Sequence, residues 1–224
     1  RKMFLNGSGN ELTGKACAVY SSSMLSYNFF HWISPSNPLS LFEHKYTKVY
    51  FEVQLPTLQG STPANMDVVL LSKNEETLLL IESKLLEYNT PSAFDIPKSY
   101  LHPSKYYGGM DGDMGKIWPD LIRECKESFK QKSQYYEGIK QNICHLIAIM
   151  NLAKGYSDAK NWFADNNKTL EIDISKIKEF HFINAIFDPA SRFKSESESF
   201  DNYKKLHKKF QSMLKGKLPS NVSI

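Results

Sequence analysis

Residues 67–84 read DVVLLSKNEETLLLIESK. Two apolar runs, residues 68–71 and 77–81, flank the short polar segment 74–76, so the stretch predicts an antiparallel β-hairpin. The runs are almost continuously apolar rather than alternating, which is typical of strands buried on both faces. We therefore expect a buried hairpin with polar residues gathered at its open end.

Those polar residues are Asp67 before the first strand, and Glu82 and Lys84 at the end of the second. Side chains alternate along a strand, so Glu82 and Lys84 project from one face and Ser83 from the other. Folding the hairpin about Glu75 brings Asp67 opposite residues 82–84. A loop with an even number of residues puts Asp67 on the Glu82/Lys84 face, whereas an odd number requires a bulge.

Two carboxylates beside an ammonium group have a clear chemical use. Carboxylate oxygens are hard ligands for Mg²⁺ or Mn²⁺, and a bound cation activates water and offsets phosphate charge. An ammonium group nearby can orient that water or stabilise an oxyanion. The alternative is an ordinary hairpin whose polar end emerges into water, since Glu-x-Lys is common by chance. The additional acid, Asp67, favours a metal site formed by Asp67 and Glu82.

The set Asp67, Glu82 and Lys84 resembles the motif of the PD-(D/E)XK nuclease superfamily, the restriction-endonuclease-like proteins. Pro63 lies four residues before Asp67, whereas the family's proline directly precedes its first acid. The resemblance implies a Mg²⁺-dependent endonuclease that hydrolyses phosphodiester bonds, with DNA favoured over RNA, and leaves 5′-phosphate products. In that scheme Asp67 and Glu82 are the two acids, and Lys84 positions the attacking water.

The predicted order of elements agrees with a mixed α/β fold and with the α-β-β-β-α-β core of that superfamily. The expected elements, over about residues 16–190, are a helix at 16–33, a strand at 49–54, the hairpin, helical segments within 118–153 and a strand at 179–187. Residues 21–30, 51–52, 64–67 and 82–87 together are similar to a bacterial subgroup of these proteins. Ser21 and Ser22 could contact a phosphate or simply cap the first helix.

Further acids are candidates for the same metal site. Glu52 lies among apolar neighbours in a predicted strand, and burying a carboxylate costs several kcal/mol unless it is paired or metal-bound. We therefore expect Glu52 to be a third metal ligand. Glu43 is a weaker candidate because it fits a surface position. Glu87 could lie beside the metal ligands without touching the metal, or it could be an ordinary acid at the end of the strand.

The helix that follows the hairpin carries several glutamines and a histidine on one face: Gln131, Gln134, Gln141 and His145. The resemblance implies that one glutamine faces the active site; Gln141 is preferred and Gln134 is next. Gln131 with Tyr135 also matches a Gln-x-x-x-Tyr element of some relatives. For each glutamine alone, a solvated amide is the stronger interpretation. His145 is interpreted as a hydrogen-bonded core residue rather than a catalytic base.

Two other segments could contact nucleic acid. Residues 88–118 are rich in proline and glycine and predict a long irregular segment. Its tyrosines could stack on bases while its lysines pair with phosphates, or the segment could be a flap packed on the fold. The residues concerned are Tyr100, Tyr106, Tyr107, Lys98 and Lys105. Residues 198–216 predict an amphipathic C-terminal helix. Its lysine face could follow a phosphate backbone or be a solvated surface, and the second interpretation is favoured.

Composition limits the class of protein. The 224 residues, of which 41% are apolar, predict one domain spanning residues 1–224. No run of 18 apolar residues predicts a membrane span. Cys17, Cys125 and Cys144 are odd in number and lack metal-ligand spacing, which favours a reducing, cytoplasmic setting. The chain begins at Arg1 rather than methionine, so an N-terminal segment, including a signal peptide, stays open.

The net charge of +4 is compatible with a polyanionic partner without demonstrating one. Nucleic acid is the expected partner, and a homodimer stays open. Two alternatives to a nuclease remain: a nucleic-acid-binding module of the same fold with little or no cleavage, and hydrolysis of a small phosphodiester. The intact set of Asp67, Glu82 and Lys84 favours the nuclease.

Overall fold

The computed structural model describes residues 22–84, 94–129, 136–186 and 194–224, and it has the expected α/β class. The strands are β1 (Leu39–Leu41), β2 (His44–Leu55), β3 (Ala64–Ser72), β4 (Thr77–Lys84), β5 (Glu179–Ile186) and β6 (Val222–Ser223). The α-helices are α2 (Ser22–Phe30), α3 (Asp113–Ser128), α4 (Tyr136–Ala153), α5 (Ser157–Asn166) and α6 (Lys194–Leu214), with short 3₁₀ turns η3 (Lys98–Leu101) and η4 (Pro103–Lys105).

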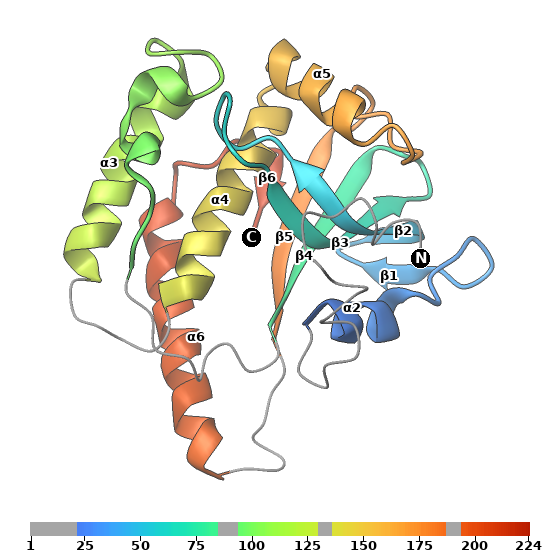
Figure 1. Cartoon of the computed structure of the whole chain (residues 1–224). Helices are drawn as coiled ribbons and strands as arrows, with labels where there is room; N and C mark the ends of the chain where they lie inside the picture. Colours follow the sequence, from blue (N-terminus) through green and yellow to red (C-terminus); the bar gives the residue numbers. More distant parts are fainter. Residues whose placement is uncertain (1–21, 85–93, 130–135, 187–193) are drawn as a thin grey trace.

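The strands form one sheet in the order β1-β2-β3-β4-β5-β6 (Figure 1). The pairs from β1 to β4 are antiparallel, and β5 then runs parallel to β4 along its whole length. The predicted hairpin is confirmed as β3 and β4, which pair from Val68↔Ile81 to Leu71↔Leu78. Both strands are interior strands of the sheet, which explains their continuous apolar runs.

Each face of the sheet has its own core. On β4, Leu78 and Leu80 belong to a large core shared with α3, α4, α5 and α6, whereas Leu79 and Ile81 belong to a smaller core beside α2. In Figure 1, α4 crosses the sheet on the side of α3 and α6, and α2 lies by β1 and β2. The alternation continues to the end of β4, and Ser83 contacts the α2 side through Ser26 Oγ, which donates to Ser83 Oγ at 2.7 Å.

A kink crosses β2 and β3 together. Phe51 and its partner Val68 lie in the smaller core, but the next pair, Val53 and Met66, lies in the large core. In a regular strand, residues two apart share a face, so both strands change face between these pairs. Glu52, between them, has a left-handed backbone with φ of 54°. Asp67 lies opposite Glu52 at the same kink.

Several boundaries differ from the expectations. The helix predicted at 16–33 ends at Phe30, and it is described only from Ser22, because residues 1–21, including Ser21 and Cys17, lie outside the described part. The helical stretch 118–153 is two helices, and α3 already begins at Asp113. The C-terminal helix begins at Lys194 rather than at 198. Helix α5 and strands β1 and β6 were not predicted.

The tyrosine-rich segment is packed rather than free to stack on bases. Tyr100, Tyr106 and Tyr107 are 7%, 0% and 5% exposed and belong to the large core. The packed-flap interpretation is therefore correct, and base stacking on these rings is wrong. The C-terminal helix also follows its predicted docked form: Tyr203 and Phe210 are buried and Lys204 and Lys208 are exposed. None of the described helices is long and apolar enough to cross a membrane.

Candidate active site

The open end of the hairpin forms one wall of a cleft of about 630 Å³ between the sheet and α4. Asp67 directly precedes Val68, which pairs with Ile81 of β4, and it therefore lies opposite Glu82. Its Oδ2 accepts a hydrogen bond of 2.7 Å from the backbone N–H of Ser83. The other lining residues come mainly from the β2–β3 connection and from α4: Thr57, Thr62, Pro63, Ala64, Asn65, Glu82, Lys84, Tyr100, Lys140, Gln141, Cys144 and His145. The structure thus brings Asp67, Glu82 and Lys84 to one cavity.

Lys84 is fixed between a carboxylate and an amide. Its Nζ donates to Glu82 Oε1 at 2.5 Å and also to Gln141 Oε1 on α4. The Lys84 and Glu82 side chains are only 4% and 5% exposed, so the ion pair is almost completely removed from solvent. Packing of α4 against the sheet therefore sets the position of the ammonium group through Gln141.

His145 lies one helical turn beyond Gln141 and approaches Glu82 from the other side. Its Nε2 is 3.1 Å from the carbonyl oxygen of Asn65, which can only accept, so Nε2 carries a proton. Its Nδ1 lies 3.6 Å from Glu82 Oε2, and both atoms are buried without a hydrogen-bond partner within the described residues. Burial lowers the pKa of His145, which favours the neutral ring. A lone pair then faces a carboxylate oxygen, an arrangement that a cation would stabilise.

The carboxylates of Asp67 and Glu82 share the buried end of the cleft with the ammonium group of Lys84. Burial, and secondly the charge of Glu82, raise the pKa of Asp67 well above its usual range, against the opposing effects of Lys84 and of the Ser83 N–H. Two carboxylates here face one ammonium group. Their oxygens, with the unpartnered Glu82 Oε2, match the hard donor set that a divalent cation such as Mg²⁺ or Mn²⁺ requires. The residues present thus fit a metal ion held by Asp67 and Glu82.

Glu52 is placed differently from the expectation. It is 8% exposed, and it lines a small separate cavity with Asn166, Asn167 and Leu170 rather than the main cleft. Its left-handed backbone accounts for this placement, because the side chain leaves the regular alternation of β2. Its charge still contributes to the raised pKa of Asp67. Glu52 as a third metal ligand stays a prediction.

Of the glutamines, the structure places Gln141 in the cleft, whereas Gln131, Gln134 and Tyr135 lie outside the described residues. The position of Glu87 is also outside them, and Glu43 is exposed in the turn between β1 and β2. The sequence places His145 on the same helix face as Gln141 and favours a hydrogen-bonded core residue. The structure confirms its burial and its contact with Asn65, and it also places His145 in the cleft beside Gln141.

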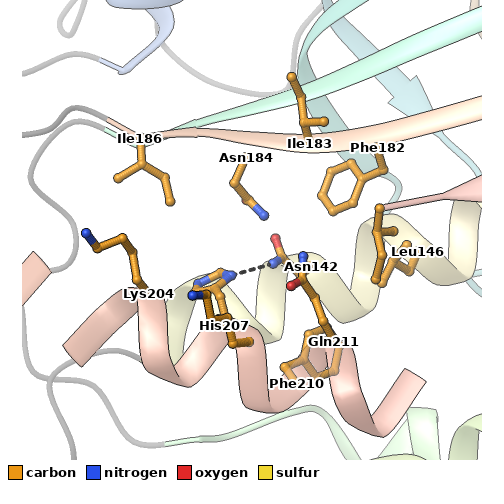
Figure 2. A pocket seen from close by; sticks show the side chains of 12 residues that line it. Asn142, Leu146, Phe182, Ile183, Asn184, Ile186, Lys204, His207, Phe210 and Gln211 are labelled. Carbon is orange, nitrogen blue, oxygen red and sulfur yellow. Dashed lines mark hydrogen bonds between the residues drawn. The ribbon is translucent and has the colours of Figure 1, made fainter. Parts of the chain in front are cut away.

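A second cavity, of about 310 Å³, lies between the end of β5 and helices α4 and α6 (Figure 2). Asn142, Asn184 and His207 point toward one another across it, and Asn142 Nδ2 lies 3.2 Å from His207 Nδ1. Burial, and secondly the charge of Lys84, lower the pKa of His207 to about 4, so this ring is neutral near pH 7. Asn184 pairs with Glu82 in the sheet, so this second cavity lies beside the cleft.

In comparisons with known proteins, no family model matches the chain, and no curated protein or solved structure is similar to it. Interpretation of the cleft therefore depends on its own residues.

Proposed function

We propose that the protein is a metal-dependent nuclease that hydrolyses phosphodiester bonds, with DNA as the favoured substrate. The observation that carries the proposal is the cleft itself, in which Asp67 and Glu82 from adjacent strands meet the buried ammonium group of Lys84. The order α2, β2, β3, β4, α4, β5, with β5 parallel to β4, fits the restriction-endonuclease-like core expected from the motif. We include that fold assignment in the proposal.

Asp67 and Glu82 would hold the cation, Mg²⁺ or Mn²⁺, which when bound lowers the pKa of a water ligand and offsets charge on the phosphate. Lys84 contributes a positive charge whose position is fixed by Gln141, and this charge can orient a water molecule or stabilise a pentacovalent phosphorane. Lys140 lines the same cleft and adds positive charge at its wall. The anionic backbone of a nucleic acid is the substrate that matches these charges.

The direct test is cleavage by wild type, Asp67→Asn and Lys84→Met with Mg²⁺ or Mn²⁺. The substrates are supercoiled, linear and single-stranded DNA, RNA, and bis-p-nitrophenyl phosphate as a small phosphodiester. Matched controls are Asp113→Asn and Lys154→Met, which break an ion pair of the same residue types between the start of α3 and the residue that follows α4. We expect metal-dependent cutting by wild type and both controls, and a loss of at least 100-fold in both cleft variants.

Three other outcomes would overturn the proposal. Binding of DNA without cutting would support the nucleic-acid-binding module. Cutting of the small diester alone would support a nucleotide phosphodiesterase. Activity that survives in Asp67→Asn would remove this cleft from the chemistry.

A further inference from the structure

A second group of potential metal ligands lies at the opposite end of the sheet, formed by His44, Glu179 and His181. His44 is the first residue of β2, and Glu179 and His181 are the first and third residues of β5. One ligand atom from each lies within 4.8 Å of the other two, and no other such group of histidine, cysteine and acidic residues occurs among the described residues. Three protein ligands of this kind, two imidazoles and a carboxylate, form a recognised zinc ligand set.

The distances suit a tetrahedral ion. Glu179 Oε2 is 3.1 Å from His44 Nε2 and 3.7 Å from His181 Nε2. Zinc–nitrogen and zinc–oxygen bonds of about 2.0–2.1 Å place neighbouring ligands of a tetrahedron about 3.3 Å apart. The observed separations bracket this value, so binding would need only small side-chain adjustments. The carboxylate of Glu179 is half exposed, which leaves a path for the ion and for a water ligand.

The histidine rings are also oriented by outer contacts. Ser223 Oγ lies 2.5 Å from His181 Nδ1, and Thr77 Oγ1 lies 3.5 Å from His44 Nδ1. Each contact leaves Nε2 as the atom that faces the cluster. His181 Nε2 is buried and has no hydrogen-bond partner within the described part of the chain. Outer hydrogen bonds of this kind fix the ring orientation and tautomer of metal-binding histidines.

The turn between β1 and β2 brings His44 to the cluster. It is a two-residue hairpin turn in which Phe42 and Glu43 have φ of 49° and 64°, a conformation that favours glycine and asparagine. Here the turn places the Phe42 ring on His181, with centroids 5.1 Å apart and planes at 16°, and delivers His44 to β5.

We propose that His44, Glu179 and His181 bind a zinc-type divalent cation through two imidazole nitrogens and one carboxylate, with water in the fourth position. The site joins the β1–β2 hairpin to β5 and, through Ser223, to the C-terminal strand β6. It is separate from the cleft, because Thr77 and Lys84 lie at opposite ends of β4, about 23 Å apart at 3.3 Å per residue. The proposal does not depend on the nuclease assignment.

The test is titration of the whole chain with Zn²⁺ alone, by competition with a chromogenic chelator under reducing conditions. We expect wild type to bind one equivalent, and His181→Ala and Glu179→Gln to bind at least 10-fold more weakly. Excess Mg²⁺ is present throughout, so that the carboxylates of the cleft do not add a zinc equivalent. His102→Ala, which removes an exposed histidine outside the cluster, is expected to bind as wild type does. Zinc should also raise the melting temperature of wild type but not that of Glu179→Gln.

Two results would overturn the proposal. The first is a folded wild type that binds no zinc, which would leave the cluster as a simple histidine–glutamate ion pair. The second is equal zinc affinity in wild type and Glu179→Gln. Glu179 is a half-exposed residue at the start of a strand, so this variant stays informative even if His181→Ala fails to fold. Ser223→Ala provides a milder change, with an expected 10-fold or greater loss of affinity.

Discussion

Replacing Lys84 by methionine is the sharpest perturbation of the candidate active site. The change removes the ammonium group but keeps the length of the side chain, so it leaves Glu82 buried without its partner. The Nζ–Oε1 distance is 2.5 Å and both side chains are at most 5% exposed. At an effective dielectric constant of about 20, such a pair has an attraction of about 7 kcal/mol, and breaking buried pairs costs about 3–5 kcal/mol after relaxation.

The assay is urea unfolding at pH 7 of wild type, Lys84→Met, the double variant Glu82→Gln/Lys84→Met, and Lys154→Met. A loss of about 4 kcal/mol, with a slope of about 2 kcal/mol/M, lowers the unfolding midpoint by about 2 M. The double variant removes both charges and should recover most of this loss. Lys154→Met breaks a pair whose partner, Asp113, is 66% exposed, and should cost under about 1 kcal/mol. A double variant as unstable as Lys84→Met would refute the reasoning, because packing rather than charge would then explain the loss.

Two further perturbations probe the same region. The pKa of Asp67 is raised in the folded state, so its negative charge destabilises the folded protein increasingly as pH rises from about 4 through the folded pKa. Urea unfolding from pH 4 to 8 should therefore show that Asp67→Asn gains stability relative to wild type as pH rises. The hydrogen bond from Lys154 lowers the pKa of Asp113, so Asp113→Asn should instead be less stable than wild type above pH 4. If the stabilities of the two variants changed with pH in the same way, the raised pKa of Asp67 would be contradicted. At the contact of α4 with α6, a β-carbon on Gly138 would overlap the hydroxyl of Tyr203. Gly138→Ala should therefore lower the free energy of unfolding by about 1–3 kcal/mol, measured by thermal unfolding. Adding Tyr203→Phe should restore part of this stability, and no restoration would show that the hydroxyl is not the obstacle.

Local periodicity was sufficient to predict the centre of the fold. The hairpin and the common face of Glu82 and Lys84 follow from two short apolar runs and one polar turn. The loop between β3 and β4 has four residues, an even number, and Asp67 lies opposite Glu82, as expected for a loop of even length. The choice of Gln141 agrees with its place in the cleft. These features depend on sequence-local rules, namely alternation along a strand and one face of a helix.

The features that sequence reasoning missed depend on contacts between distant segments. Nothing in the local pattern at Glu52 indicates a left-handed residue, because the kink is shared with β3 across the sheet. The sequence left the tyrosine-rich segment open between a packed flap and base stacking, and the burial of Tyr106 is decided by packing of its loop against the large core. The cluster of His44 with His181 joins residues far apart in the sequence through a turn whose backbone conformation is unusual for its residue types.

The energetics of the cleft connect stability to the proposed chemistry. The fold keeps Asp67 beside Glu82 and Lys84 although burial and the second carboxylate raise the pKa of Asp67 and so disfavour its charged form. A core that served stability alone would place neutral residues there, since burying unpaired charge is unfavourable. The neutral variant Asp67→Asn is therefore expected to be both more stable above pH 4 and inactive as a nuclease. A residue that lowers stability but is needed for activity is expected at a functional site. A variant that gained stability while keeping its activity would separate the two and leave the charge of Asp67 without an explanation.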